Sequence, residues 1–338
     1  MTELSSAQIG QRLQAKLSAV TGSDIDILQV RALSGGAASM SYAVEASREG
    51  RDWPLVLQCS SEGSGDAESS RTMTRAVQAA LQQRVGAHGV AVPDIVAVLE
   101  PDDGLGKGFV MAFVRGETLA PRYLRKLEFA AARDALMSDT ASALAHLHAI
   151  PASEFADLAL PTLDGPAQLA SLIELYDSLG GDVPVFEMAF ALLKQRLKPC
   201  ADPVLVHGDY RSGNFIVGER GLASVLDWEL AHIGDPWLDI GWLSTNTWRF
   251  GNWRQPVGGF GQREDFYQAY EAAGGRSVDR DAVLAFEMLG SLRWGVMCLQ
   301  MSAKADSGDM ISVERAAIGR RVSETEADLL HIMQHGSV

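Results

Sequence analysis

The chain has 338 residues, of which 47% are hydrophobic, enough for a sizeable core and for two lobes or domains. Its formal net charge of -14 excludes a broad basic face and argues against nucleic acid as a partner. The cysteines are odd in number and far apart (Cys59, Cys200, Cys298), so they form neither a disulfide framework nor a metal-ligand spacing. Because we find no signal-peptide core and no apolar run of membrane-spanning length, we expect a cytoplasmic protein that has no membrane partner.

The first 115 residues predict a small sheet with helices. Apolar spacing predicts a helix at 5–20. Five β-like segments predict a three-stranded antiparallel meander and two further strands: Asp26–Leu33, Met40–Ser47, Trp53–Cys59, Ile95–Leu99 and Gly108–Val114. A further helix is expected at about 66–85, with one apolar face made of Met73, Val77, Ala80 and Leu81.

After Gly116 the pattern becomes helical. Helices are predicted in the ranges 122–148, 165–198 and 262–333, and a short β-like insert interrupts them at 204–228. This order predicts an α+β fold with a β-rich N-terminal part, residues 1–115, and a helical C-terminal part, residues 116–338.

The stretch from Val204 to Trp242 carries the strongest chemical pattern. A short strand leads into His207-Gly208-Asp209, Asn214 follows, and a hairpin ends at Asp227. If Arg220 and Gly221 form a two-residue turn, Asn214 lies opposite Asp227, with Cβ atoms roughly 5 Å apart. Two oxygen ligands at that spacing can hold Mg²⁺ together with phosphate oxygens.

Two charged residues in this stretch suit phosphoryl transfer. An ionised Asp209 on the loop that enters the hairpin can accept the proton of an incoming hydroxyl. Arg211, two residues later, can lie over a transferring phosphate and offset its charge.

The same residues carry a resemblance to a known family. His-Gly-Asp-Tyr-Arg-Ser-Gly-Asn resembles the catalytic loop H-x-D-x-x-x-x-N of aminoglycoside phosphotransferases and, more distantly, of protein kinases. Val-Leu-Asp-Trp-Glu and Gly-Asp-Pro-Trp-Leu-Asp-Ile-Gly-Trp resemble the segments that follow that loop. The sequence of these three motifs is most similar to the branch of the family whose domains are also found fused to acyl-CoA dehydrogenases. The resemblance implies a two-lobed, protein-kinase-like fold in which 1–115 bind the nucleotide and 116–338 carry catalysis and the substrate.

The resemblance also assigns roles. It implies that Asp209 is the catalytic base, that Asn214 and Asp227 bind magnesium, and that Asp239 supports the catalytic loop from a helix start. His207, at the end of an apolar strand, is interpreted as a structural hydrogen-bonding residue. Asp235, which precedes a proline, is interpreted as a turn residue.

Two segments are candidates for nucleotide binding. The loop from Leu33 to Tyr42 resembles the L-S-G-G-x-x-[ST]-x-x-Y loop of the same branch. Its small residues let backbone N–H groups approach a phosphate, and the residues concerned are Ser34, Gly35, Gly36, Ala37, Ala38 and Ser39. By the same resemblance, Met111 and Phe113 belong to the hinge that binds adenine.

One position departs from the family pattern. Kinases place a Lys on the third strand and this branch often has Arg, but here Gln58 occupies the position. A neutral amide cannot form a charge-assisted bond to phosphate. The helix that follows also lacks the expected Glu around residues 71–78. Arg71 or Arg75 is an alternative source of positive charge.

The leading hypothesis is an enzyme that uses ATP and Mg²⁺ to phosphorylate a hydroxyl of a small molecule, with a hydroxyacyl compound as one candidate acceptor. The alternative is a nucleotide-binding pseudokinase or scaffold with weak or no transfer activity, favoured by Gln58. A metal-dependent hydrolase built on His207 and Asp209 is a third reading, which would need more His or carboxylate ligands. The sequence leaves the substrate and the oligomeric state open.

Overall fold

The computed structural model describes residues 4–33, 40–59, 73–306 and 313–336. The chain forms two compact units. The first contains Met1–Gly116 together with Asp157–Ala159 and Ala223–Leu230, and the second contains the remaining residues. A linear division at residue 115 does not include the two short segments that join the first unit.

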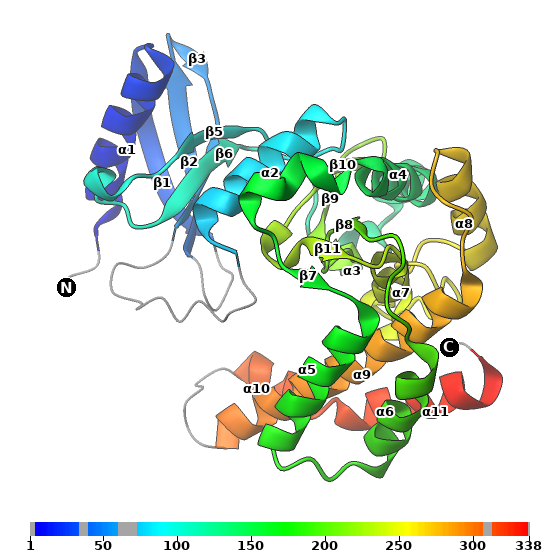
Figure 1. Cartoon of the computed structure of the whole chain (residues 1–338). Coiled ribbons are helices and arrows are strands. Elements are labelled where there is room, and N and C mark those ends of the chain that lie inside the picture. The colour runs from blue at the N-terminus through cyan, green and yellow to red at the C-terminus, as the bar shows by residue number, and fades with distance from the viewer. Residues whose placement is uncertain (1–3, 34–39, 60–72, 307–312, 337–338) are drawn as a thin grey trace. The chain divides into compact units, whose positions relative to one another are not determined.

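The first unit is built on an antiparallel sheet with strand order β1-β2-β4-β6-β5, and a short strand, β3, pairs with β2 (Figure 1). The predicted five-stranded sheet is confirmed, and β3 is an addition to it. The strands are β1 (Ile25–Leu33), β2 (Met40–Arg48), β3 (Arg51–Asp52), β4 (Leu55–Cys59), β5 (Ile95–Val98) and β6 (Gly108–Ala112).

A helix covers each face of this sheet. Helix α1 (Ser6–Thr21) begins with a capping box between Ser5 and Gln8 and packs its buried side chains against one face. Helix α2 (Arg75–Ala87) packs Ala79 against Val56 on the other face. Successive side chains of β4 therefore point alternately toward α1 and toward α2.

The predicted apolar face of α2 is confirmed only at Leu81, since Val77 and Ala80 are half-buried. Residues 73 and 74 are not helical, Thr74 caps the helix by accepting a hydrogen bond from the Val77 N–H at 3.3 Å, and residues 60–72 lie outside the described part of the chain. The buried side of α2 consists of Gln78, Ala79, Leu81, Gln82 and Val85. Gln82 donates to the backbone oxygen of Pro93 at 2.6 Å, so a polar side chain occupies a buried position that hydrophobic spacing assigns to apolar residues.

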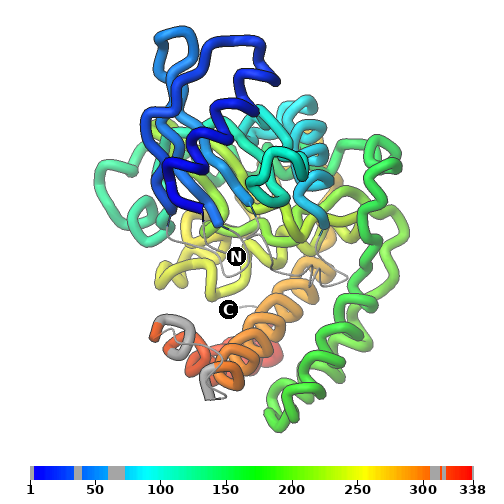
Figure 2. The backbone as a smooth tube through the Cα atoms, turned by 90° about the vertical axis from the view of Figure 1, so that its left-hand side faces the viewer, coloured from blue at the N-terminus to red at the C-terminus, as the bar shows by residue number. Residues whose placement is uncertain are grey.

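The second unit is helical, and α9 runs through its core. Figure 2 shows this long helix in orange beside two green helices formed by residues 165–196. An 18-residue window of α9 is apolar enough to cross a membrane, but 72% of that window is buried inside the unit, as expected of a core helix. The helices are α3 (Ala120–Tyr123), α4 (Ala130–Ala149), α5 (Gly165–Ser178), α6 (Pro184–Arg196), α7 (Trp237–Ser244), α8 (Arg263–Ala272), α9 (Arg280–Asp306), α10 (Val313–Gly319) and α11 (Val322–His335).

Short strands lie among these helices. Strand β11 pairs antiparallel with β8 and parallel with β7, and β9 pairs with β10. The range predicted as helical at 122–148 contains the end of α3 and all but the last residue of α4, with the 3-10 helix η2 (Leu127–Phe129) between them. The strands are β7 (Thr162–Leu163), β8 (Val204–Val206), β9 (Phe215–Val217), β10 (Leu222–Val225) and β11 (His232–Gly234).

The turn of the β9–β10 hairpin differs from the prediction. The Gly218 N–H donates to the Gly221 oxygen at 2.9 Å, so Glu219 and Arg220 form the two-residue loop. The predicted pairing of Asn214 with Asp227 assumed a loop at Arg220 and Gly221, one residue later in the chain, and is wrong. Gly221 serves close packing instead: a Cβ there would lie 2.0 Å from Asp139, whose carboxylate accepts the Leu222 N–H.

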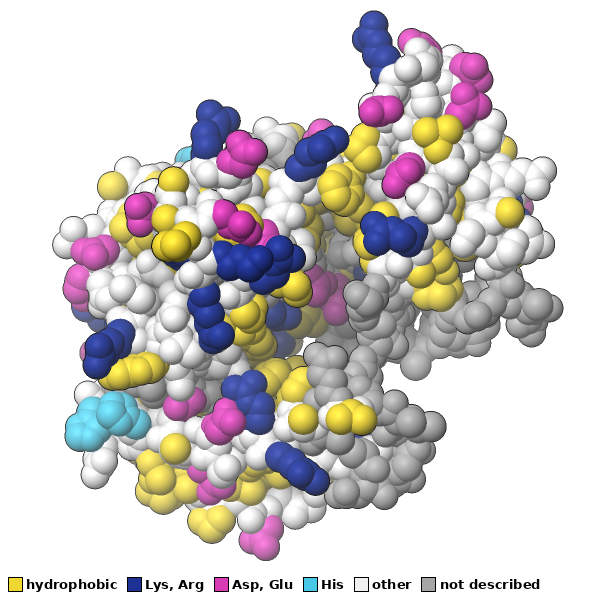
Figure 3. Space-filling view, turned by 180° about the vertical axis from the view of Figure 1, so that it is seen from behind, with side chains coloured by type: hydrophobic (Ala, Val, Ile, Leu, Met, Phe, Trp, Pro, Cys, Tyr) yellow, Lys and Arg dark blue, Asp and Glu magenta, His cyan; other side chains and the backbone are white. Residues whose placement is uncertain are grey.

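Charged side chains of both signs are spread over one face of the described part of the molecule (Figure 3). On the face shown in Figure 3, Lys and Arg side chains are interspersed with Asp and Glu. Several of these charges form exposed pairs, such as Arg280 with Glu264 and Arg321 with Glu324. Exposed pairs of this kind contribute little to stability, and their main effect is on solubility.

Candidate catalytic site

The catalytic-loop candidates are built around Asp239, which is fully buried near the start of α7. Its two carboxylate oxygens accept the backbone N–H groups of His207 at 2.7 Å and Gly208 at 2.9 Å. His148 of α4 lies 3.3 Å from the same carboxylate and contacts the hydroxyl of Tyr270 through its other ring nitrogen at 3.0 Å. The buried carboxylate therefore holds the chain direction at the end of β8.

The environment of Asp239 favours its charged form. Burial alone would raise the pKa of this carboxyl, but the hydrogen bond and charge of His148, together with His207, lower the pKa below its usual value. A lowered carboxyl pKa means that the unfolded chain binds more protons below the usual value of 3.8. The stability that Asp239 contributes is complete above that pH and is lost as the pH falls through the lower, folded-state pKa.

Asp209 is held by three donors. Its Oδ1 accepts the indole N–H of Trp242 at 2.6 Å, and its Oδ2 accepts the side-chain amide of Asn214 at 2.7 Å. Arg211 Nε lies 3.0 and 3.1 Å from the two oxygens. An ionised carboxylate only accepts hydrogen bonds, so these three donors fix the direction of both Asp209 oxygens.

The structure places Arg211 beside Asp209 rather than pointing freely outward. Its guanidinium lies over the ring of Trp248 at 4.3 Å, and its side chain is 22% exposed. A Cβ at Gly213 would lie 1.9 Å from Arg211 Nη1. The absence of a side chain at Gly213 therefore makes room for the Arg211 guanidinium.

The rest of the loop is fastened to neighbouring elements of the same unit. The Tyr123 hydroxyl donates to the Ser212 oxygen, and the Ser212 hydroxyl donates to the Gly258 oxygen at 2.6 Å. Tyr210 is buried and donates to the Thr140 oxygen at 2.8 Å. Burial raises the pKa of Tyr123 and Tyr210, so both remain neutral donors at physiological pH.

Sequence reasoning missed His148 and Trp242 as parts of this site. No role was assigned to Trp242 from the sequence. Its place in the Gly-Trp that ends the segment 234–242 was the available signal. His148 carries no local motif, because its role depends on a contact across 91 positions of the chain.

Trp242→Phe tests the indole contact. The variant keeps the aromatic packing and removes the donor to Asp209, so we expect kcat to fall about tenfold, which corresponds to about 1.4 kcal/mol, with KM for ATP unchanged. Trp253, which is 60% exposed, supplies the control, since Trp253→Phe should leave both constants as they are. A Trp242→Phe enzyme with full kcat would show that this donor does not position Asp209.

The oxygen ligands proposed for magnesium have suitable chemistry. Asn214 uses its amide nitrogen for two bonds to Asp209, one to the carboxylate and one to the backbone oxygen, so its side-chain oxygen is fixed in direction. Asp227 follows β10 with φ 66°, a strained value for a residue other than glycine and a feature that concentrates at functional sites. Both are hard oxygen donors, as Mg²⁺ prefers, and two protein ligands are enough where phosphates complete the shell.

The nucleotide-side candidates lie in the first unit. Gln58 is in β4, opposite Ser41 of β2 and Phe109 of β6. Met111 is buried in β6, and the Phe113 N–H already donates to the Pro54 oxygen at 3.1 Å, so that amide is engaged within the sheet. The predicted phosphate loop, residues 34–39, lies outside the described residues.

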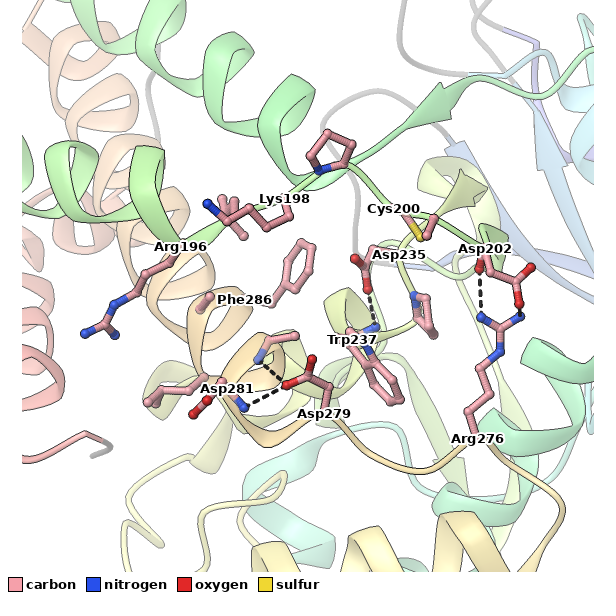
Figure 4. A pocket seen from close by; sticks show the side chains of 17 residues that line it. Arg196, Lys198, Cys200, Asp202, Asp235, Trp237, Arg276, Asp279, Asp281 and Phe286 are labelled. Atoms are coloured by element: carbon pink, nitrogen blue, oxygen red, sulfur yellow. Dashed lines mark hydrogen bonds and ion pairs between the residues drawn. The ribbon is translucent and has the colours of Figure 1, made fainter.

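The second unit also contains a pocket of about 660 Å³ at the other end of β8. Figure 4 shows two of its aspartates engaged locally: Asp279 accepts the N–H groups of Asp281 and Ala282, and Asp235 accepts the Trp237 N–H at 3.0 Å. Burial raises the pKa of Asp235. No residue of the loop 207–214 lines this pocket, and the contact of Asp235 is that of a turn residue.

Comparison with known proteins decides the family. A model of the phosphotransferase enzyme family, the aminoglycoside phosphotransferase (APH) family, matches residues 29–277. The chain belongs to this family. It is accordingly a phosphotransferase of the kinase type whose acceptor is a hydroxyl group.

Solved structures share the fold of this APH-family chain over almost its whole length. A proposed aminoglycoside phosphotransferase from Ralstonia eutropha is 19% identical with a TM-score of 0.68, covering 94% of this chain and 95% of that one. Spectinomycin phosphotransferase, solved with ADP and spectinomycin, is 14% identical with a TM-score of 0.63, covering 97% and 99%. The predicted two-lobed, kinase-like fold is confirmed.

A curated relative matches the branch named by the sequence motifs. Acyl-CoA dehydrogenase family member 10 of Mus musculus is 27% identical over 164 residues, which is 45% of this chain and 15% of that protein. The predicted resemblance to APH domains fused to acyl-CoA dehydrogenases is thereby confirmed. The match takes in 15% of that protein, so the activity of the whole relative is not assigned to this chain.

Proposed function

We propose that this APH-family phosphotransferase transfers the γ-phosphate of ATP, with Mg²⁺, to a hydroxyl of a small molecule in the cytoplasm. The observation that carries the proposal is the fixed orientation of Asp209 by Trp242, Arg211 and Asn214. Phosphoryl transfer depends mostly on positioning and charge neutralisation, so a rigid acceptor for one proton is the part that the protein must build.

The reaction assigns a role to each residue. The acceptor hydroxyl donates to Asp209 as its oxygen attacks the γ-phosphorus, the bond to the leaving ADP breaks, and the proton passes to the carboxylate late in transfer. Arg211, which is paired with Asp209, would stabilise charge on the transferring group. Asn214 and Asp227 would hold Mg²⁺, which supplies neutralisation of phosphate charge when bound.

For the acceptor we propose a hydroxyacyl compound. Trp242, Trp248 and Trp294 form a continuous aromatic cluster, with ring centroids 5.1 Å apart at each step, and the first of them contacts Asp209. All three side chains are buried, so the cluster forms an apolar wall behind Asp209, and the acyl chain would lie beside this wall rather than on an open ring face. The relative linked to acyl-CoA dehydrogenases supports the same choice.

The test is a transfer assay with γ-labelled ATP and two matched sets of acceptors, hydroxyacyl thioesters with their free acids, and aminoglycosides. We expect label in a hydroxyacyl product, dependent on magnesium. Label appearing in an aminoglycoside would keep the kinase assignment and reject the acceptor class.

A pseudokinase is the second candidate, and the neutral Gln58 favours it. A pseudokinase would bind ATP without releasing ADP above the rate of a boiled control, whichever acceptor is present. The two functions therefore separate on turnover rather than on binding.

A further inference from the structure

Gln58 faces the helix α2. In β4, Leu55, Leu57 and Cys59 belong to the cluster that includes α1, whereas Val56 packs with Ala79 of α2. Side chains alternate along a strand, so Gln58 projects from the α2 side together with Val56. The position that the family resemblance assigns to a phosphate-binding cation is thus neutral and directed toward α2.

A cation on α2 lies close to this position. Arg75 begins the helix one turn before Ala79, so both residues share the face of α2 that meets the sheet. The Arg75 side chain is only 16% exposed. Burial raises the pKa of Cys59, the neighbour of Gln58, to about 11, and the nearby charge of Arg75 partly opposes that rise. The guanidinium therefore acts electrostatically on the end of β4.

Among the described residues, the contacts of Arg75 orient its guanidinium but do not use all of its N–H donors. Nη1 donates to Gln78 Oε1 at 2.7 Å, and Gln78 is itself buried. Nη2 lies 3.9 Å from Glu229 Oε2, at the limit of an ion pair, and Glu229 is 38% exposed. A long, partly solvated pair of this kind contributes little, so a doubly charged phosphate can replace the carboxylate as partner.

Glu229 belongs to the same unit as α2, in the segment that also carries the proposed magnesium ligand Asp227. It lies in the 3-10 helix η5 (Trp228–Leu230), two residues after Asp227. The Val225 N–H donates to the Ala91 oxygen at 2.8 Å, which ties the end of β10 to the chain after α2. Arg75 therefore lies between the end of β4 and the segment that carries a proposed magnesium ligand.

We propose that Arg75 supplies the phosphate-binding cation of this chain from the helix, in place of a cation on the strand, with Gln78 orienting it and Glu229 as its partner before nucleotide binds. In the usual kinase arrangement the cation is on the strand and its acidic partner is on the helix. In this chain the cation, Arg75, is on the helix, and its acidic partner, Glu229, follows Asp227 in the chain. The ligand is the polyphosphate of a nucleoside di- or triphosphate, which a planar guanidinium binds through paired N–H groups. The proposal rests on the proposed function.

The test measures dissociation constants by isothermal titration for adenosine, ADP and ATP with magnesium. We expect Arg75→Gln to raise Kd for ADP and ATP about 10- to 100-fold and to leave Kd for adenosine unchanged. Arg84→Gln is the matched control, because Arg84 is on the same helix but bonds Asp157 through two nitrogens, and it should stay within about twofold of wild type.

Charge relocation gives a result that a purely structural role would not produce. Adding Gln58→Arg to Arg75→Gln returns a cation to the strand and should recover most of the lost affinity for ADP and ATP. Should Arg75→Gln fail to fold, Glu229→Gln provides the second test. Removal of the competing carboxylate should lower Kd for ADP several-fold, and an unchanged or higher Kd would contradict the proposal.

The possible outcomes distinguish the proposed role of Arg75 from the kinase assignment on which it rests. A wild-type protein that binds ADP and ATP, with an Arg75→Gln variant that binds them equally well, would overturn the role of Arg75 and leave the kinase assignment standing. A wild-type protein that binds neither nucleotide would overturn both. Loss of adenosine affinity in Arg75→Gln equal to the loss for ADP would mean that Arg75 supports the fold and not the phosphates.

Discussion

Asp209→Asn is expected to lower kcat for phosphoryl transfer by about 10²- to 10⁴-fold, the range that general-base catalysis contributes. The amide cannot accept the hydroxyl proton, although its oxygen can still accept from Trp242 and Arg211. If Asn214 turns its amide to accept from the new side-chain nitrogen, it gives up its bond to the backbone oxygen of residue 209, so the loop loses one hydrogen bond and keeps the others. The measurement is single-turnover transfer with labelled ATP, beside an ATP titration that should give wild-type affinity.

Asp134→Asn is the matched control for this variant. Asp134 lies exposed on α4 and makes no contact with the loop 207–214 among the described hydrogen bonds. It should transfer at the wild-type rate. Full transfer by Asp209→Asn would remove Asp209 as the base and with it the mechanism proposed above.

Glu287→Ala is expected to lower the free energy of unfolding by about 3–5 kcal/mol, because it leaves the buried cation Arg249 without its carboxylate partner. Glu287 of α9 lies between Arg249, 3.0 Å from Oε1, and Arg263, 2.7 Å from Oε2, and the side chains of Glu287 and Arg249 are both fully buried. Urea unfolding at pH 7 measures the loss. Glu264→Ala breaks an Arg–Glu pair that is more than half exposed and should produce no resolvable change.

The pH dependence of this variant has a definite sign. Burial lowers the pKa of Arg249 to about 10, and the charge of Glu287 opposes that fall. Without Glu287 the folded-state pKa falls further, so the unfolded chain binds more protons than the folded one above that value. The stability of Glu287→Ala should therefore recover as the pH is raised from 7 toward 10. A deficit that stays constant with pH would show that the loss comes from packing rather than from the unpaired charge.

The catalytic loop was readable from the sequence because its chemistry is local. Asp209, Arg211 and Asn214 are five residues apart or less, and the structure joins all three through hydrogen bonds. The order of strands and helices was also readable, since period-2 and period-3.6 patterns are properties of short segments. Whether Asn214 and Asp227 bind magnesium remains a prediction.

Features that depend on distant parts of the chain were not readable. Arg211 was expected over a phosphate, and its pairing with Asp209 and stacking on Trp248 required the aromatic cluster to be known. Most of the buried face of α2 was missed because Gln78 and Gln82 are buried with hydrogen-bond partners. The hairpin register was missed because Gly221 is required by the approach of Asp139 and not by the turn.

The most direct test of the central claim, that this chain is an ATP- and magnesium-dependent kinase, is isothermal titration of the purified protein with ATP in the presence and absence of magnesium. Binding is expected to be tighter with magnesium, and Asp227→Ala should lose that gain, since Asp227 is a proposed ligand. ATP that fails to bind at millimolar concentration, or that binds equally with and without magnesium, would contradict this claim.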